Sequence, residues 1–273
     1  MEHHGEIPQQ NVIAIIPARY ASTRLPGKLL LDIVGSPMIV HTLRRASAAR
    51  LVSRVIVATD DERIFEVAVQ NGFEAVMTSP EHHSGSDRIA EVASSQIEES
   101  IIVNVQGDEP AISPDTIDKA VRSMIADPDA DIVTTSEAVE HAADVTDPNI
   151  VKVVTDAAGY ALYFSRLPIP FPRAARSRFG TWEEMFAAEP ELLRQYRKHT
   201  GLYVYRREFL LRFANMDPAP LEKFEMLEQI RALENGAKIR VVDACSTSIS
   251  VDTADDLDRV RNLFATPGAA SGS

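Results

Sequence analysis

The sequence predicts an α/β fold built on a mostly parallel sheet. Through the first half of the chain, short runs rich in β-branched residues alternate with segments whose apolar residues recur at helical spacing. Strands that alternate with helices indicate βαβ units, whose parallel sheet is covered on both faces. The chain has 273 residues, of which 45% are hydrophobic, so it is long enough to bury one large core.

The first half supplies most of the predicted sheet. Strands are predicted where β-branched runs are bounded by turn residues, at 12–16, 55–58, 75–77, 101–105 and 131–139. Helices are predicted at 38–49, 62–71 and 87–97, and from Pro114 onwards.

The second half departs from this alternation. Two strand-like runs at 150–155 and 160–164 flank four turn residues, which predicts a β-hairpin insertion. A proline-rich stretch then leads to Arg173, Arg176 and Arg178, where we expect a mobile basic loop. The remaining elements are predicted at 202–205 (strand), 221–235 (helix, ended by Gly236), 238–242 (strand) and 253–264 (helix).

Neither an internal repeat nor a low-complexity linker divides the chain. We therefore expect one domain at 12–264, with the hairpin and mobile loop at about 150–200. Residues 1–11 and 265–273 are expected to be a disordered extension and a disordered tail.

Charge and composition exclude several classes of partner. With 28 Lys and Arg against 40 Asp and Glu, the net charge is -12, which disfavours nucleic acid and anionic membranes. No apolar run approaches the ~18 residues of a membrane span, and the N-terminus lacks a signal-peptide pattern, so we expect a cytoplasmic protein without membrane association. A single cysteine, Cys245, argues against disulfide and zinc chemistry.

One segment reverses the sign of the charge. Between Glu6 and Asp32 the chain carries three cations, Arg19, Arg24 and Lys28, and no acid. The segment follows the first predicted strand, at the edge of a parallel sheet where ligands bind, and it could surround a polyphosphate. Its pattern matches neither a Walker loop nor a dinucleotide-binding glycine motif, which excludes P-loop hydrolysis and dinucleotide redox chemistry.

Two carboxylates follow strands on what we expect to be the same side of the sheet. Asp108 follows the strand at 101–105, beyond its carboxyl end. A carboxylate that faces a polyphosphate favours a magnesium ion between them. Asp252 is a second candidate ligand, and a helix N-cap is an equally good use of it. Asp108 could also be an ordinary turn residue.

Two further groups are candidates for binding. Ser84 and Ser86, with Gly85 and Arg88, could donate to a base or a phosphate, although a plain capping turn would look the same. In the second half of the chain, polar side chains that would suit an acidic sugar occur at Arg166, His199, Tyr203, Glu228 and Gln229. Taken one at a time, each of these could be an ordinary surface or core-edge residue.

Together, five segments resemble the 3-deoxy-manno-octulosonate cytidylyltransferase family, the CMP-Kdo synthetases. They lie at 17–28, 83–88, 106–110, 198–203 and 251–253, within a resemblance that spans nearly all of 12–264. The pattern Arg-x4-Arg-x2-Gly-Lys is common to a wider superfamily of sugar-nucleotide transferases. The sequences Gln-Gly-Asp-Glu-Pro at 106–110 and His-Thr-Gly-Leu-Tyr at 199–203 narrow it to this family.

The resemblance implies a Rossmann-like sheet of the nucleotide-diphospho-sugar transferase type. It also implies the reaction of CTP with 3-deoxy-D-manno-octulosonate (Kdo) to give CMP-Kdo and pyrophosphate, with Mg²⁺ as cofactor, for lipopolysaccharide biosynthesis. A homodimer formed through the hairpin region is implied as well.

Residue roles carry over from the matching motifs. The nucleotide would be bound by Arg19, Ser22, Arg24, Lys28, Ser84, Ser86 and Arg88, magnesium by Asp108 and Asp252, and the sugar by Gln106, Arg166, His199, Tyr203, Glu228 and Gln229. Arg19, Lys28, Asp108 and Asp252 would be catalytic. Two alternatives stay open: a cytidylyltransferase for another acidic sugar such as an acylneuraminate, and a sensor that binds a sugar nucleotide without turnover.

Overall fold

A computed structural model describes residues 11–21 and 24–265. The strands are β1 (Val12–Ala18), β2 (Asp32–Ile33), β3 (Ser36–Pro37), β4 (Arg54–Thr59), β5 (Glu74–Met77), β6 (Ile101–Asn104), β7 (Ile132–Ala138), β8 (Lys152–Thr155), β9 (Ala161–Ser165), β10 (Arg197–Arg206) and β11 (Ile239–Asp243). The α-helices are α1 (Met38–Ser47), α2 (Glu62–Gln70), α3 (Gly85–Ser94), α4 (Pro114–Ala126), α5 (Ala142–Thr146), α6 (Arg173–Arg176), α7 (Trp182–Ala188), α8 (Arg207–Ala214), α9 (Pro220–Glu225), α10 (Gln229–Glu234) and α11 (Ala254–Ala265). Short 3-10 helices η1 (Lys28–Leu30) and η2 (Pro190–Gln195) complete the described part.

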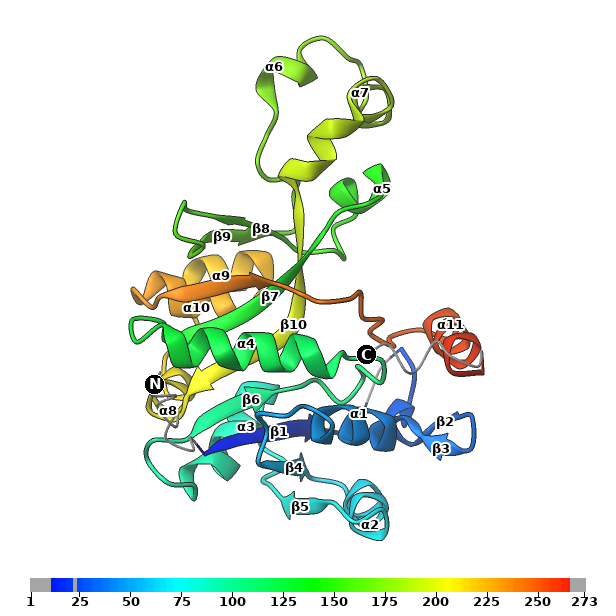
Figure 1. Ribbon diagram of the computed structural model, residues 1–273, viewed down its shortest axis with the longest axis vertical. Coiled ribbons are helices and arrows are strands. Elements are labelled where there is room, and N and C mark those ends of the chain that lie inside the picture. Colours follow the sequence, from blue (N-terminus) through cyan, green and yellow to red (C-terminus); the bar gives the residue numbers. More distant parts are fainter. Residues whose placement is uncertain (1–10, 22–23, 266–273) are drawn as a thin grey trace, which may run out of the picture.

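The main sheet is mixed and mostly parallel, with strand order β11-β7-β10-β6-β1-β4-β5 (Figure 1). β10 runs antiparallel to both neighbours, β6 and β7, whereas the β1, β4, β5 and β6 pairings are parallel. The β8–β9 hairpin joins the sheet through β10. Since β1 and β6 lie side by side, the segments that follow them leave the sheet at the same edge. The α/β fold and the hairpin are therefore as predicted.

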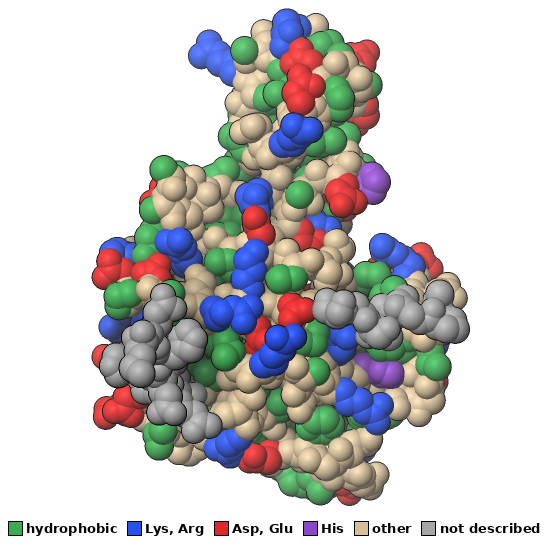
Figure 2. Space-filling view, viewed as in Figure 1, with side chains coloured by type: hydrophobic (Ala, Val, Ile, Leu, Met, Phe, Trp, Pro, Cys, Tyr) green, Lys and Arg blue, Asp and Glu red, His purple; other side chains and the backbone are tan. Residues whose placement is uncertain are grey.

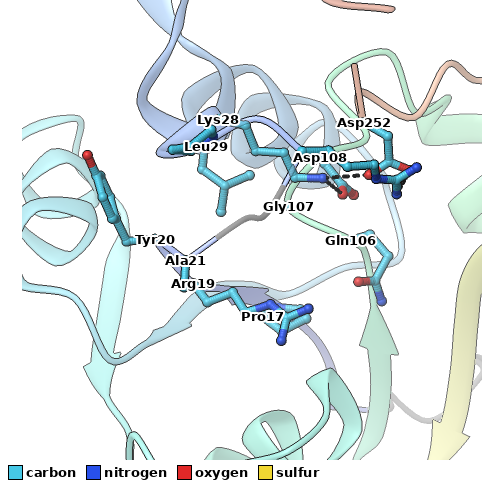
Figure 3. A pocket seen from close by; sticks show the side chains of 12 residues that line it. Pro17, Arg19, Tyr20, Ala21, Lys28, Leu29, Gln106, Gly107, Asp108 and Asp252 are labelled. Carbon is cyan, nitrogen blue, oxygen red and sulfur yellow. Dashed lines mark hydrogen bonds and ion pairs between the residues drawn. The ribbon is translucent and has the colours of Figure 1, made fainter. Parts of the chain in front are cut away.

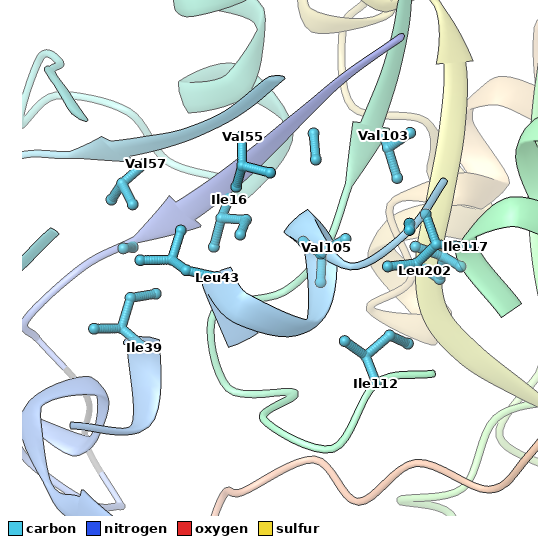
Figure 4. Packing of buried hydrophobic residues seen from close by; sticks show 14 of the residues in the cluster. Ile16, Ile39, Leu43, Val55, Val57, Val103, Val105, Ile112, Ile117 and Leu202 are labelled. Carbon is cyan, nitrogen blue, oxygen red and sulfur yellow. The ribbon is translucent and has the colours of Figure 1, made fainter. Parts of the chain in front are cut away.

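Hydrophobic clusters lie on both faces of the sheet, as expected when successive residues of a strand point to opposite sides. In β1, Ile16 packs with Leu43 and Val103 on one face, and its neighbour Ile15 lies in the cluster on the other face (Figure 4). All four side chains are buried. This two-sided burial explains why the parallel strands appear in the sequence as continuous apolar runs rather than as an alternating pattern.

In the second half of the chain, one predicted strand and one predicted helix differ from the structure. β10 is ten residues long rather than four, and begins at Arg197. The predicted helix at 221–235 is divided into α9 and α10, because Met226 between them adopts a left-handed conformation (φ 54°). A left-handed residue ends the hydrogen-bonding pattern of a right-handed helix, so one helix could not continue through it.

Short helices occupy the segment that was predicted to be a mobile basic loop. Figure 1 shows α6 and α7 projecting beyond the sheet, with α5 beside them. They enclose a separate hydrophobic cluster in which Met185, Phe186 and Tyr196 are buried. Arg176 holds the bend between the two helices, because its guanidinium donates to the carbonyls of Phe179 and Thr181. The proline content correctly indicated irregular backbone but concealed this small core.

The predicted disordered ends fall almost wholly outside the described residues. Of those that are described, Ala265 is the last residue of α11, so the helix extends one residue beyond the predicted domain boundary. Among the described helices, none combines the length and apolarity needed to cross a membrane.

Candidate active site

A cavity of about 610 Å³ opens at the edge where β1 and β6 end (Figure 3). Three segments line it: the loop after β1, the turn after β6, and the chain that enters α11. We call it the ionic cavity, after the charged residues that line it: Arg19, Arg24, Lys28, Asp108 and Asp252. The structure thus brings together the cations and the two carboxylates that the sequence placed far apart.

Lys28 lies at the centre of the ionic cavity. Its Nζ donates to Asp108 Oδ2 at 2.5 Å, to Asp252 Oδ1 at 2.9 Å and to the carbonyl of Val251 at 3.0 Å. Burial opposes the charge of the ammonium, but the attraction of both carboxylates and their hydrogen bonds outweigh it, so the pKa of Lys28 is raised. Figure 3 shows this convergence by its dashed lines.

Two glycines shape the loops of the cavity. At Gly27 the backbone is left-handed (φ 67°), and a Cβ there would lie 2.9 Å from the ring of Tyr20. At Gly107 a Cβ would come within 3.3 Å of Leu29 and Ile39 and 3.2 Å of the carbonyl of Pro17. A side chain at Gly107 would push the turn after β6 away from the loop after β1, so this glycine sets the position of Asp108 relative to Lys28, whereas Gly27 supplies the left-handed turn that leads into Lys28.

The position of Asp252 resolves the alternative left open by its sequence context. Thr253 and Asp256 cap α11: Asp256 N donates to Thr253 Oγ1 at 3.2 Å, and Thr253 N donates to Asp256 Oδ2 at 3.0 Å. The carboxylate of Asp252 instead accepts from Lys28 and from Arg24, whose Nη2 lies 2.9 Å from Asp252 Oδ2. It is therefore a residue of the cavity rather than a helix cap.

A smaller adjoining cavity is lined by Arg19, His82, Ser84, Gly85, Arg88 and Gln106, together with Pro17 and Ala18. Ser84 forms a capping box with Asp87 at the start of α3, so the capping interpretation of this motif is correct. Ser84 and Gly85 nevertheless line the cavity as well. Ser22, the remaining predicted nucleotide ligand, lies outside the described residues.

The other predicted residues of α3 face away from open solvent. Arg88 is buried, and its guanidinium donates to Asp60 Oδ2 at 2.8 Å and Thr78 Oγ1 at 2.5 Å. Ser86 is also buried, and its Oγ donates to Glu228 Oε2 at 2.9 Å. Arg88 thus fixes the start of α3 against β4 and β5, while Ser86 links α3 to the region predicted to bind the sugar.

The region predicted to bind the sugar is formed by β10, which lies next to β6, and by the start of α10. His199, Tyr203, Glu228 and Gln229 are here called the aromatic cradle, after the rings of Phe164, His199 and Tyr203 that pack in succession. Asn104 on β6 pairs with Tyr203 and accepts from Gln106 Nε2 at 3.0 Å, so Gln106 connects the cradle to the ionic cavity.

His199 is held neutral in the aromatic cradle. Desolvation of the imidazole among its neighbours lowers its pKa to about 3. The hydroxyl of Thr134 donates to the carbonyl of Leu202 at 2.8 Å, so it accepts from His199 Nε2, which lies 2.9 Å away. The Nδ1 atom is then the unprotonated acceptor of the ring. Burial raises the pKa of Tyr203, so both groups act as neutral hydrogen-bonding partners.

Two buried polar atoms of the cradle have no hydrogen-bond partner. They are Glu228 Oε1 and Gln229 Nε2, two of the four such side-chain atoms among the residues that the structure describes. Burial raises the pKa of Glu228, against the hydrogen bond from Ser86. Buried polar atoms without partners are costly, and they cluster where a ligand supplies the missing contact.

Arg166 contacts backbone carbonyls around the hairpin and before Glu228. Its guanidinium donates to the carbonyls of Glu225 at 2.7 Å, Pro148 at 2.9 Å and Met226 at 3.4 Å. These contacts join the hairpin to the α9–α10 turn. In this structure Arg166 therefore supports the backbone, whereas the other predicted sugar ligands line or adjoin the cradle.

Sequence reasoning missed three residues that support the site. Ser248 donates through Oγ to Glu109 Oε2 and through its backbone N to Glu137 Oε1 at 3.1 Å. Both glutamates are buried, and burial raises the pKa of Glu109 to about 7. They hold the segment that carries Asp252, which has no regular structure of its own. Only the position of Glu109 in the Gln-Gly-Asp-Glu-Pro motif could have indicated this role.

Comparisons with known proteins show the family to which the chain belongs. A family model described as cytidylyltransferase matches residues 13–239. A protein named 3-deoxy-manno-octulosonate cytidylyltransferase from Geobacter sulfurreducens is 52% identical over 250 residues, covering 92% of this chain and 98% of that protein. This chain belongs to the 3-deoxy-manno-octulosonate cytidylyltransferase family. A relative of the same name from Solibacter usitatus is 47% identical, with 93% of this chain and 95% of that protein covered.

The solved structure of a CMP:2-keto-3-deoxy-manno-octonic acid synthetase complexed with CTP superposes with a TM-score of 0.83 at 39% identity. The match covers 94% of this chain and 99% of that one. A cytidylyltransferase from Leptospira borgpetersenii, at 16% identity and a TM-score of 0.61, shares the fold over 93% of this chain and 87% of its own. The family assignment thus rests on close relatives, and the fold extends well beyond them.

Proposed function

We propose that this protein transfers CMP from CTP to the anomeric hydroxyl of Kdo, giving CMP-Kdo and pyrophosphate. The observation that carries the proposal is the adjacency of two unlike regions: an ionic cavity and an aromatic cradle, connected through Gln106. The first suits a triphosphate, and the second suits a polyhydroxy sugar. The close relatives named for this reaction support the same assignment.

The ionic cavity would hold the triphosphate. Arg19 and Arg24 supply guanidinium donors, which bind phosphate oxygens in two-point fashion, and Lys28 supplies an ammonium. In the transfer, a bond forms between the anomeric oxygen and the α-phosphorus while the bond from the α-phosphorus to the bridging oxygen of pyrophosphate breaks. These cations would stabilise the negative charge that develops on pyrophosphate as it leaves. The adjoining cavity at Ser84 would receive the cytosine.

Asp108 and Asp252 fit a magnesium ion. Their carboxylate oxygens lie within 2.9 Å of one nitrogen, that of Lys28, so they converge on one point. Among the described residues no group of three or more His, Cys, Asp or Glu could hold a metal, but magnesium commonly takes one or two carboxylates and completes its shell with phosphates and water. Bound there, the ion would lower the pKa of the sugar hydroxyl and orient it.

The aromatic cradle would bind Kdo. Gln229 Nε2 and Glu228 Oε1, which lack hydrogen-bond partners, would donate to and accept from the sugar, and His199 Nδ1 would accept from a hydroxyl. A site built to pair with hydroxyls rejects analogues that lack them, because its own polar atoms then stay unpaired.

Exposed apolar side chains near the hairpin favour a homodimer. Leu162, Leu167, Phe171, Phe224 and Met226 are all more than half exposed. Leu167 and Met226 lie near one another, because Arg166, which precedes Leu167, donates to the carbonyls of Glu225 and Met226. We expect Phe224→Asp to convert the dimer to a monomer, as measured by sedimentation equilibrium. Ile97→Asp, at another exposed apolar residue, is the control, and a wild-type monomer would refute this assignment.

A cytoplasmic role in lipopolysaccharide biosynthesis follows from the proposed reaction, since CTP is made and kept inside the cell. The face drawn in Figure 2 carries acidic and basic side chains interspersed, with no continuous basic surface. Fractionation of cells that produce the protein tests the location: it should be recovered with cytoplasmic markers, and recovery with the periplasmic fraction would contradict it.

The reaction is tested by incubating the protein with CTP, magnesium and one sugar at a time. Pyrophosphate release is measured, and the phosphodiester product is identified by ³¹P NMR. We expect release with Kdo, and little with an acylneuraminate or without sugar. Faster release with an acylneuraminate would reassign the sugar, and binding of CTP without release under any condition would favour a sugar-nucleotide sensor.

A further inference from the structure

The ammonium of Lys28 uses all of its hydrogen-bonding capacity within the protein. A lysine ammonium has three N–H donors, and here they serve Asp108 Oδ2, Asp252 Oδ1 and the carbonyl of Val251. The side chain is only 13% exposed. In this arrangement Lys28 has no donor left for a phosphate. Its predicted role toward the triphosphate therefore requires the ammonium to leave this position.

The same ammonium stands where a cation bound by both carboxylates would stand. Two carboxylates that converge on one point repel each other unless a positive charge lies between them. Lys28 supplies that charge from within the chain. Arg24 also contacts Asp252, but it is 63% exposed and the structure gives it no contact with Asp108. Lys28 alone among the described cations is paired with both carboxylates.

We propose that Lys28 is the resident counter-ion of the Asp108–Asp252 pair and exchanges places with the divalent cation when CTP binds. This rests on the proposed function, because it assumes that the pair binds magnesium. Before CTP arrives, Lys28 holds the two carboxylates together and excludes the metal. When the triphosphate enters, the ammonium moves to phosphate oxygens, and the carboxylates become available to the cation. Lys28 is thereby a positioning residue in the free protein and a phosphate ligand in the loaded one.

The surroundings allow this exchange without a change of backbone. Lys28 begins η1, whose backbone is fixed by the bonds from Leu30 N to the Gly27 carbonyl and from Leu31 N to the Lys28 carbonyl. Beyond the Cα the side chain is a flexible four-carbon stem that lines the ionic cavity. Rotation of its side-chain torsions moves the ammonium while both loops stay in place. The metal is then expected to enter together with the nucleotide rather than before it.

The test measures Mn²⁺ binding to the nucleotide-free protein by electron paramagnetic resonance, with Mn²⁺ as a magnesium substitute. Removing a positive charge next to the carboxylates should strengthen binding to Lys28→Met by about tenfold or more. Lys28→Arg keeps the charge and should bind as weakly as the wild type. Arg24→Met is the matched control, because it removes a cation that contacts only Asp252, and it should strengthen binding much less. Circular dichroism confirms folding, and Lys28→Gln replaces Lys28→Met if that variant does not fold.

Equal Mn²⁺ affinities in Lys28→Met and the wild type would overturn the proposal. So would an equal gain in Arg24→Met, because the effect would then be one of general charge rather than of occupancy. A parallel set of titrations with CTP tests the metal site itself. With CTP present, the wild type should bind Mn²⁺ more tightly than it does without CTP. In Asp108→Asn, CTP should not strengthen Mn²⁺ binding. If CTP does not strengthen Mn²⁺ binding to the wild type, the Asp108–Asp252 pair does not bind magnesium. If CTP does strengthen it, but nucleotide-free Lys28→Met binds Mn²⁺ no more tightly than the nucleotide-free wild type, only the exchange is overturned.

Discussion

The ionic cavity and the aromatic cradle use polar groups in opposite ways. In the ionic cavity the charges of Lys28, Asp108 and Asp252 are paired with one another, and the side chains remain partly exposed. In the cradle, Glu228 Oε1 and Gln229 Nε2 are buried atoms without a hydrogen-bond partner, and burial raises the pKa of Glu228 and lowers that of His199. The difference indicates a division of labour: paired charges can be exchanged for those of a triphosphate and a cation, while atoms without hydrogen-bond partners select a ligand that completes them.

The largest effect is expected from a change in the ionic cavity. Asp108→Asn should lower kcat by about a thousandfold or more, because charge stabilisation in the transition state dominates phosphoryl transfer. The KM for Kdo should change little, since the cradle is intact. Steady-state pyrophosphate release measures both constants, and Asp258→Asn, on the exposed face of α11, is the control. If Asp108→Asn instead raised the KM for Kdo and left kcat unchanged, the proposed division of roles between the ionic cavity and the cradle would be wrong.

A change in the cradle should have the opposite signature. Gln229→Leu keeps the volume but removes the unpartnered Nε2, so kcat/KM for Kdo should fall about ten- to a hundredfold. The KM for CTP should stay near the wild-type value. The same assay, run with each substrate varied in turn, measures both constants. Gln70→Leu, on the exposed side of α2, should be silent. An equal rise in both KM values would mean that the regions do not act separately.

Ser248→Ala tests how the ionic cavity is held in place. The variant loses the bond from Ser248 Oγ to Glu109, leaving that buried carboxyl without its donor. We expect a rise of about tenfold in the magnesium concentration required for half-maximal turnover, because Asp252 is less well positioned. The free energy of unfolding should fall by about 1–3 kcal/mol. Ser248→Thr, which keeps the hydroxyl, should restore both values, and failure to do so would remove Ser248 from this role.

The smallest effect on turnover is expected from Glu109→Gln, because the amide oxygen of glutamine can still accept the hydrogen bond from Ser248 Oγ. Burial raises the pKa of Glu109 from 4.5 to about 7 in the folded protein. The native state therefore binds a proton more tightly than the unfolded chain, and stability should fall as the pH rises from about 4.5 to about 7, by about 3 kcal/mol in all. Glu109→Gln should flatten this slope in urea unfolding at a series of pH values. A variant with the wild-type slope would contradict the buried position of the carboxyl.

The sequence predicted best what depends on local pattern. The β1, β4, β5 and β6 strands follow from β-branched runs, and the cavity follows from cations and carboxylates placed after two of them. For the motif at 82–88, the sequence left a capping turn and a binding loop as equal alternatives. In the structure Ser84 caps α3, and Ser84 and Gly85 also line the smaller cavity.

What the sequence did not predict depends on contacts between distant segments. Nothing local to Ser248 indicates two buried glutamates, one from the turn after β6 and one from β7. The break at Met226 occurs within a good helical pattern, so periodicity alone predicted one helix. The contacts of Arg166 with the carbonyls of Pro148 and Glu225 likewise join segments that are far apart in the sequence. In each case tertiary contacts decide what a residue does.

If the charges of the ionic cavity act on CTP only when the cradle holds a sugar and a divalent cation is present, pyrophosphate release should depend on both. Release from CTP is measured with and without Kdo, and with magnesium either supplied or removed by a chelator. We expect rapid release only when Kdo and magnesium are both present. Release that persists without the sugar, or after the metal is chelated, would contradict this expectation.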